Sequence, residues 1–143
     1  MAFQLHPQVL GARTRTNKDI FYNTKEGLPR ADRELAAAAT SREHGCVFCA
    51  SVHARFASHY SDRHDDVQRL LDEGSAADLG PRWNAAVAAA TALAQTPPML
   101  NSAHIQAVQN EGLDALELAD VIHGAAFFNW ANRLMLSLGE PER

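Results

Sequence analysis

Several features are missing from this 143-residue sequence, and each absence excludes a class of protein. No apolar run approaches the roughly 18 residues that a transmembrane helix needs. The N-terminus has no basic segment followed by an apolar core, so a secretory signal is not expected. Lys and Arg total 13 against 17 Asp and Glu, a net charge of −4, whereas nucleic-acid and anionic-membrane binders need clustered positive charge. We therefore expect a cytoplasmic protein that binds neither nucleic acid nor membranes.

Cysteine and β-branched residues are also scarce. The sequence has two cysteines, Cys46 and Cys49, whereas a disulfide scaffold needs more of them at wider spacing. In a cytosolic chain such a pair is more typical of redox or metal chemistry. Val and Ile together occur ten times and Ala occurs 26 times. Because β-branched residues favour strands and Ala is the best helix former, the composition predicts an all-α protein.

Helix-breaking and capping residues divide the sequence into about six predicted helices. Pro29 is typical of a helix start, and Gly45 and Pro97 are typical of helix ends. The helices are expected at residues 30–43, 46–60, 63–73, 81–95, 102–112 and 114–138, with Ser61 or Asp62 as the cap of the third. Residues 1–28 are less regular and are expected to form an extended or partly helical arm. Residues 29–143 are expected to form a single domain.

The residues with the clearest chemical potential lie at the start of the second predicted helix. Cys46, Cys49 and His53 fall within an arc of about 60° if they all belong to one helix, because each residue turns it by about 100°. Cys46 lies at the helix N-terminus, where the dipole and the free N–H groups favour a thiolate. A Cys-x-x-Cys pair in that position can form a disulfide reversibly, with one thiolate attacking and the other resolving.

Glu34 is the fourth candidate, on the preceding helix. It lies twelve residues before Cys46, and Ala36 to Ala39 follow it closely. Small side chains let the next helix pack tightly, so we expect Glu34 to reach the face that carries the thiols and His53. A carboxylate there can accept a proton from a thiol, directly or through the imidazole.

The spacing of these four residues resembles the signature of a known family. The pattern Glu34-x11-Cys46-x2-Cys49-x3-His53 is similar to that of the AhpD-like alkylhydroperoxidases, in the carboxymuconolactone decarboxylase superfamily. The lead-in at residues 28–35 resembles the family's usual one. The segment Phe127-Phe128-Asn129-Trp130-Ala131-Asn132-Arg133, with Gly139, is similar to the tail of its peroxidase-related members. The resemblance covers roughly residues 28–140.

This resemblance implies both a fold and an activity. It implies an AhpD-like helical bundle that assembles as a homo-oligomer, often a trimer or hexamer. It implies a thiol peroxidase in which Cys46 and Cys49 cycle between dithiol and disulfide, while Glu34 and His53 carry the proton relay. No bound cofactor and no metal are expected. The expected partners are a hydroperoxide or other small-molecule substrate and a reducing protein or thiol, such as a lipoyl-type donor.

One position departs from the family pattern. In the best-known members a second histidine stands immediately before the second cysteine, and here that position is Phe48. The substitution removes one ionisable group and makes the neighbourhood of the thiols more apolar.

Other interpretations of the same residues stay open. Cys46, Cys49 and His53, with His44 or Glu34, have the chemistry of a zinc site in a metal-binding or redox-sensing subunit. A non-redox decarboxylase or isomerase of the superfamily would use His53 and Glu34 as acid and base, without the thiols. The order of attack is also open, since the helix dipole favours Cys46 and proximity to His53 favours Cys49.

Overall fold

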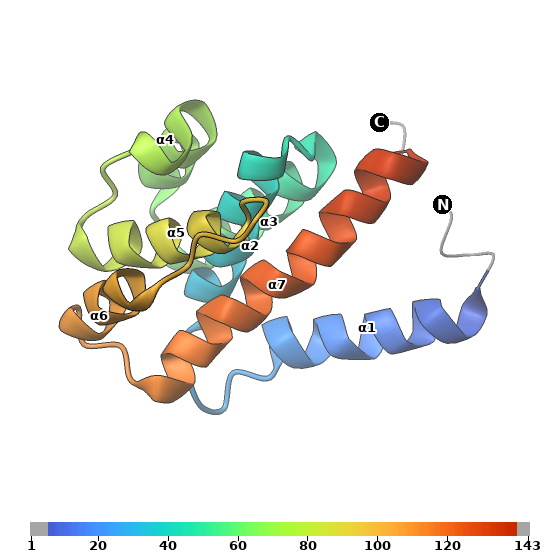
Figure 1. Ribbon diagram of the computed structural model, residues 1–143, viewed down its shortest axis with the longest axis horizontal. Helices are drawn as coiled ribbons and strands as arrows, with labels where there is room; N and C mark the ends of the chain where they lie inside the picture. The colour runs from blue at the N-terminus through green and yellow to red at the C-terminus, as the bar shows by residue number, and fades with distance from the viewer. Residues whose placement is uncertain (1–5, 140–143) are drawn as a thin grey trace.

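The computed structural model describes residues 6–139, and within them the chain forms seven α-helices and one 3₁₀ turn, with no strand (Figure 1). The all-α prediction is therefore confirmed. The helices are α1 (Pro7–Tyr22), α2 (Arg30–His44), α3 (Val47–Ser61), α4 (His64–Glu73), α5 (Pro81–Leu93), α6 (Ser102–Asn110) and α7 (Ala115–Leu138), and the 3₁₀ turn is η2 (Gly74–Ala76).

Most helix ends follow the predicted local chemistry. Gly45 ends α2 in the left-handed conformation, with φ 76°. Asn101 and Asp114 cap α6 and α7, and each accepts a hydrogen bond from the backbone N–H groups of the first turn. The predicted cap of α4 is wrong, because Arg63 is the residue before the helix and no side chain caps it.

The N-terminal segment differs most from the prediction of about six helices. Residues 7–22 form α1, a 16-residue helix that starts with Pro7 and lies against α2 and α7 (Figure 1). Its one buried side chain is Phe21, which is 1% exposed. Because only one side chain of α1 is buried, its sequence has no strong helical periodicity of apolar residues, and the helix is hard to predict.

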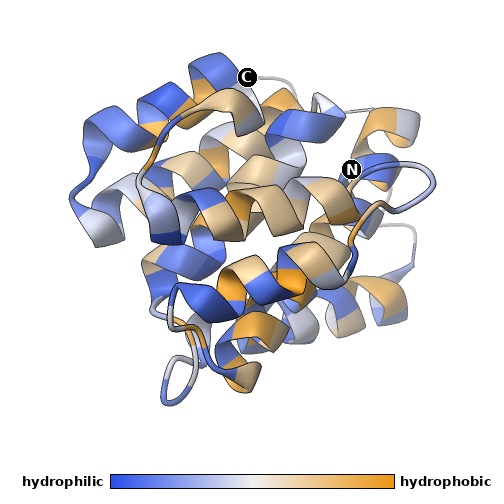
Figure 2. Cartoon of the chain, turned by 60° about the vertical axis from the view of Figure 1, so that its left-hand side comes forward, coloured by the Kyte–Doolittle hydropathy of each residue, from blue (hydrophilic) through white to orange (hydrophobic). Residues whose placement is uncertain are grey.

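The centre of the bundle is α2, which contacts α3, α5 and α7. Ala36 to Ala39 are at most 1% exposed, so the helix backbones approach closely, as their size predicts. Figure 2 shows the middle of the bundle coloured toward the hydrophobic end, with hydrophilic residues at the periphery. Among the described residues, none of the helices has both the length and the apolar character of a membrane span.

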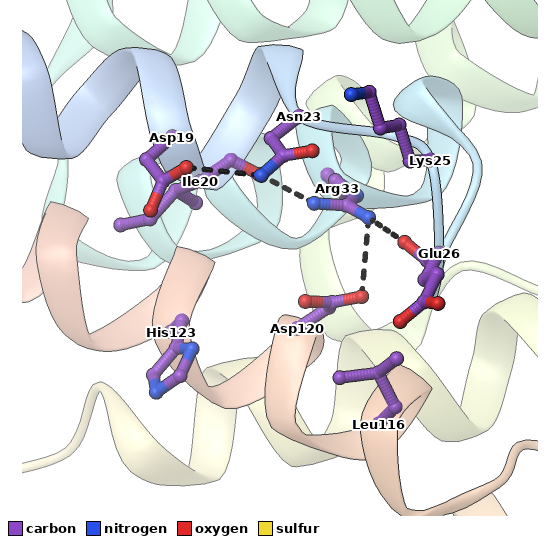
Figure 3. A pocket seen from close by; sticks show the side chains of 9 residues that line it. All are labelled: Asp19, Ile20, Asn23, Lys25, Glu26, Arg33, Leu116, Asp120 and His123. Atoms are coloured by element: carbon purple, nitrogen blue, oxygen red, sulfur yellow. Dashed lines mark hydrogen bonds and ion pairs between the residues drawn. The ribbon is translucent and has the colours of Figure 1, made fainter.

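The link between α1 and α2 is fastened by Arg33, whose side chain is almost fully buried (Figure 3). Its guanidinium donates to the backbone carbonyls of Ile20, Glu26 and Leu28 at 2.6–2.9 Å. It also forms an ion pair with Asp120 of α7 at 3.3 Å. Because these bonds join the end of α1 to α2 and α7, Arg33 fixes where α1 lies.

Candidate active site

Glu34 of α2 is a buried carboxylate with both oxygens engaged. It is 1% exposed. The Arg30 guanidinium, one turn earlier, donates to Oε1 at 2.6 Å, and Nδ1 of His53 contacts Oε2 at 2.5 Å. A carboxylate at this depth persists when it is paired and hydrogen-bonded. The prediction that Glu34 reaches His53 is therefore confirmed.

The contact with Glu34 also defines the roles of the two nitrogens of His53. Because an ionised carboxylate can only accept a hydrogen bond, Nδ1 carries the hydrogen and donates a hydrogen bond to Glu34. Nε2 is then the nitrogen that can take a proton from another group. The ring of Phe128 packs edge-on against the imidazole at 4.1 Å between centroids, and Phe21 lies at 5.3 Å, so the ring orientation is fixed by packing as well.

The two cysteines occupy different positions, which corrects the prediction of one shared face. Cys46 precedes the helix: its backbone is extended, with φ −78° and ψ 92°, and α3 begins at Val47. The regular helical spacing therefore applies only to Cys49 and His53, which lie one turn apart inside α3. Both thiols are buried, and both contribute to the apolar cluster around Phe128 and Met135.

Cys49 and His53 line a cavity of about 240 Å³ between α1, α2, α3 and α7. The polar lining residues include Arg13, Asn17, Arg30 and Glu34. The apolar walls are Phe21, Tyr22, Phe48, Val52, Phe56, Phe128, Ala131 and Met135. Cys46 is not among the lining residues, so only three of the four predicted site residues meet at this cavity.

Cys46 instead lines a second hollow of about 450 Å³ on the other side of the Cys-x-x-Cys segment. Its other lining residues come from the end of α2, the start of α3 and α4, and they are Ser41, Arg42, Gly45, Val47, Ala50, Ser51 and Leu71.

Two cations reach the Cys49 cavity, and neither was predicted as a site residue. Arg30 stacks on the rings of Tyr22, Phe56 and Tyr60 at 4.0, 5.2 and 4.9 Å. Burial acts to lower the pKa of Arg30, but the hydrogen bond and charge of Glu34 raise it above its ordinary value. The position of Arg30 four residues before Glu34 was the signal available in the sequence.

Arg13 of α1 is the second cation. Burial lowers the pKa of Arg13 from its ordinary value, and the attraction of Cys49 partly opposes that effect. Its guanidinium also lies over the ring of Phe127, at 5.6 Å from the centroid. No motif marks Arg13, because its approach to Cys49 depends on where α1 packs.

His44, the possible zinc ligand, and a further histidine, His123, lie outside the Cys49 cavity. His44 contacts the Ala94 carbonyl and Asn132, and His123 lines a groove between α1 and α7 beside Asp120 (Figure 3). Within residues 6–139, no cluster of three or more His, Cys, Asp or Glu side chains is placed to hold a metal ion.

A comparison with models of known protein families identifies the family of this chain. The model of the carboxymuconolactone decarboxylase family matches residues 7–92, more than half of the chain. The chain belongs to the carboxymuconolactone decarboxylase family. The matched region contains Arg13, Arg30, Glu34, Cys46, Cys49 and His53, and it begins within the segment that we expected to be an arm.

Solved structures confirm the AhpD-like fold of this family member. A peroxidase-related protein with an alkylhydroperoxidase AhpD core from Ralstonia eutropha JMP134 has a TM-score of 0.84 at 22% identity, covering 96% of this chain and 72% of that one. A peroxidase-related protein from Silicibacter sp. TM1040 has a TM-score of 0.83 at 20% identity, with 95% and 71% covered. No curated protein sequence matches the chain.

The debrominase Bmp8 has the same fold. Its TM-score is 0.81 at 18% identity, covering 98% of this chain and 74% of that one. A variant of Bmp8 in which one cysteine is replaced by alanine has been crystallised with 2,3,4-tribromopyrrole.

Proposed function

We propose that this carboxymuconolactone decarboxylase family member is a thiol peroxidase that reduces small organic hydroperoxides. The observation that carries the proposal is the meeting of Cys49 with the His53–Glu34 pair in one cavity. This arrangement supplies a nucleophile, a base whose second nitrogen is available, and a carboxylate that orients the base.

In the first step the Cys49 thiolate attacks the terminal oxygen of the hydroperoxide, after its proton has passed to His53. The O–O bond breaks, Cys49 becomes a sulfenic acid, and the alkoxide takes up a proton and leaves as an alcohol. The sulfur is oxidised by two electrons and the peroxide is reduced by the same two.

In the second step the Cys46 thiolate attacks the sulfur of the Cys49 sulfenic acid. The S–O bond breaks, the hydroxide takes up the proton that the Cys46 thiol gave up and leaves as water, and a Cys46–Cys49 disulfide forms. An external dithiol or reducing protein then returns two electrons and two protons. We assign the first attack to Cys49 because it shares the cavity with His53, whereas Cys46 lines the hollow on the opposite side.

The test is a thiol titration after one equivalent of cumene hydroperoxide, with mass spectrometry of the peptide that contains residues 46–53. The wild type is expected to lose two thiols and about two mass units, the two hydrogens given up to the bridge. Cys46→Ser is expected to stop at a sulfenic acid that dimedone traps, and Cys49→Ser to leave the peroxide unreacted. Two intact thiols in the folded wild type would overturn the proposal.

Reductive dehalogenation is a second candidate, favoured by the fold shared with the debrominase Bmp8. The two thiols would supply the electrons, with a C–Br bond replaced by C–H, bromide released and the disulfide formed. Bromide release from 2,3,4-tribromopyrrole by the reduced wild type, and its absence in Cys49→Ser, would support this reaction. Turnover of a ring-cleavage lactone that survives thiol alkylation would instead favour a non-redox decarboxylase.

A further inference from the structure

Most of the polar side chains that line the Cys49 cavity already have partners within the protein. Both oxygens of Glu34 are bonded, one by the Arg30 guanidinium and the other by Nδ1 of His53. The Arg30 guanidinium also stacks on three aromatic rings. The charge of Arg13 acts on Cys49. These contacts orient the thiol and its base, and they are in place before a substrate enters.

Asn17 of α1 differs from the other polar lining residues. It is partly buried and lines the cavity. Within residues 6–139 its side chain forms no hydrogen bond or ion pair. A carboxamide supplies two N–H donors and one acceptor oxygen. Its hydrogen-bonding capacity is therefore available to a molecule in the cavity.

The position of Asn17 on α1 places it close to the proposed base. Arg13, Asn17 and Phe21 follow one another at intervals of four residues, so they share one face of the helix, and all three line the cavity. The ring of Phe21 lies 5.3 Å from the imidazole of His53, measured between centroids. Asn17 stands one turn before Phe21, about 6 Å along the helix axis, and so lies on the wall next to the ring that contacts His53.

The proposed peroxidase reaction creates a charge that a donor in this place can stabilise. When the Cys49 thiolate attacks the terminal oxygen of the hydroperoxide, the O–O bond breaks and negative charge develops on the leaving oxygen. The aromatic and aliphatic walls of the cavity have no donor for that oxygen. An N–H group fixed at the wall lowers the barrier, because its hydrogen bond to the developing alkoxide is stronger than its hydrogen bond to the neutral peroxide.

From this arrangement we infer that the side-chain N–H group of Asn17 donates to the leaving oxygen of the hydroperoxide and stabilises the alkoxide until it takes up the proton held by His53. The inference rests on the proposed function, because it concerns one step of that reaction. Two other roles make different predictions. In one, Asn17 only packs α1 over the cavity, and in the other its oxygen accepts a hydrogen bond from the peroxide O–H.

The test compares two oxidants of similar size whose leaving groups differ in basicity. Breaking the O–O bond of tert-butyl hydroperoxide releases an alkoxide, whereas peracetic acid releases the weakly basic acetate. The measurement is the rate at which the reduced protein loses its thiols to one equivalent of each oxidant. Asn17→Leu is expected to slow the reaction with tert-butyl hydroperoxide by at least about tenfold, as a lost hydrogen bond to a charged group does. The reaction with peracetic acid should slow by less than about threefold, because acetate needs little stabilisation.

Two further variants separate the possible roles of the carboxamide. Asn17→Asp keeps the shape and the oxygen but loses the donors, so it should lower the ratio of the two rates at least as much as Asn17→Leu does. A role as acceptor predicts instead that Asn17→Asp keeps the wild-type ratio. Gln8→Leu is the matched control, since it removes a carboxamide from an exposed position of α1 outside the cavity, and both rates should stay unchanged. Thermal melting checks that each variant is folded.

The outcomes distinguish this inference from the proposed function. A wild type that leaves tert-butyl hydroperoxide unreacted overturns both. A wild type that reacts, together with a folded Asn17→Leu protein that reacts equally fast, overturns the inference alone. Equal slowing of Asn17→Leu with both oxidants also overturns it, because a loss of packing affects the two reactions alike.

Discussion

Cys46 and Cys49 are three residues apart in the chain and share one apolar cluster, but they line different cavities. Cys49 shares a cavity with aromatic walls with His53, Glu34 and two arginines. Cys46 precedes the helix and lines a hollow on the other side of the segment, whose lining residues include Arg42 and Leu71 and no aromatic side chain. The difference suggests that the two thiols have different roles. Cys49 reacts with the substrate, whereas Cys46 attacks the oxidised Cys49 to form the disulfide and lies on the side that the reductant reaches.

Glu34→Gln tests this difference in roles with the largest expected effect. The substitution keeps the shape but removes the charge that holds Nδ1 of His53 and balances Arg30. We expect the single-turnover reduction of cumene hydroperoxide to slow by at least about 100-fold, the usual range for lost acid–base assistance. Glu43→Gln, at an exposed position of the same helix, is the control and should react like the wild type. An unimpaired Glu34→Gln protein would remove Glu34 from the chemistry.

Arg30→Met tests the electrostatic support on the Cys49 side. Loss of the cation leaves Glu34 buried and paired only with His53, so we expect the free energy of unfolding to fall by about 2–3 kcal/mol. This is less than the about 3–5 kcal/mol of a fully buried pair, because Arg30 is only partly buried. Arg30→Lys should lose less. Urea unfolding of the three proteins makes the comparison, and equal stability of Arg30→Met and wild type would contradict it.

Gly27→Ala tests whether α1 closes the Cys49 cavity. Gly27 has φ 79°, and a Cβ there would lie 2.0 Å from Oδ2 of Asp120, within the contacts that fasten α1. Gly112→Ala is the matched control, with φ 86° and no atom within 4 Å of the added Cβ. Both variants bear the cost of a left-handed alanine, about 1–2 kcal/mol, and Gly27→Ala should lose at least about 1 kcal/mol more.

The same pair of variants gives a chemical readout. If α1 loosens in Gly27→Ala, a bulky maleimide should alkylate Cys49 faster, whereas the rate at Cys46 should stay that of the wild type. Peptide mass spectrometry after timed alkylation separates the two rates. Equal acceleration at both thiols would mean that the variant loosens the whole bundle.

Ser51→Trp tests the Cys46 side and should have the smallest effect. Ser51 is exposed and lines the Cys46 hollow but not the Cys49 cavity. The reaction with the first equivalent of peroxide should be unchanged, and the reduction of the disulfide by dithiothreitol should slow a few-fold. Ser75→Trp, at another exposed position outside both hollows, controls for the added ring. A slower first reaction would show that the two sides are not separate.

Many of the helix ends, and one contact of the candidate site, could be predicted from short segments of the sequence. The helix ends at Gly45, Asn101 and Asp114 follow from backbone chemistry within one turn, so composition and capping residues predict them. The contact of Glu34 with His53 could be predicted from the run of alanines between them. The helix α1 was predicted only as an extended or partly helical arm; it has a single buried residue, Phe21, and its formation depends on the partners it packs against.

The all-helical class, the family pattern and the candidate residues could be assigned without a structure, because each depends on residue type and on separations along one or two helices. The candidate residues are Glu34, Cys46, Cys49 and His53. The folded structure was needed to show which thiol shares the cavity with His53, and that Arg13 and Arg30 line the same cavity. Those placements depend on the N-cap geometry of Cys46 and on the packing of α1 against α2 and α7. The packing of α1 joins segments far apart in the chain, so spacing along the sequence carries no information about where Arg13 lies. The turn at Cys46 is local, but the regular helical spacing does not apply to it.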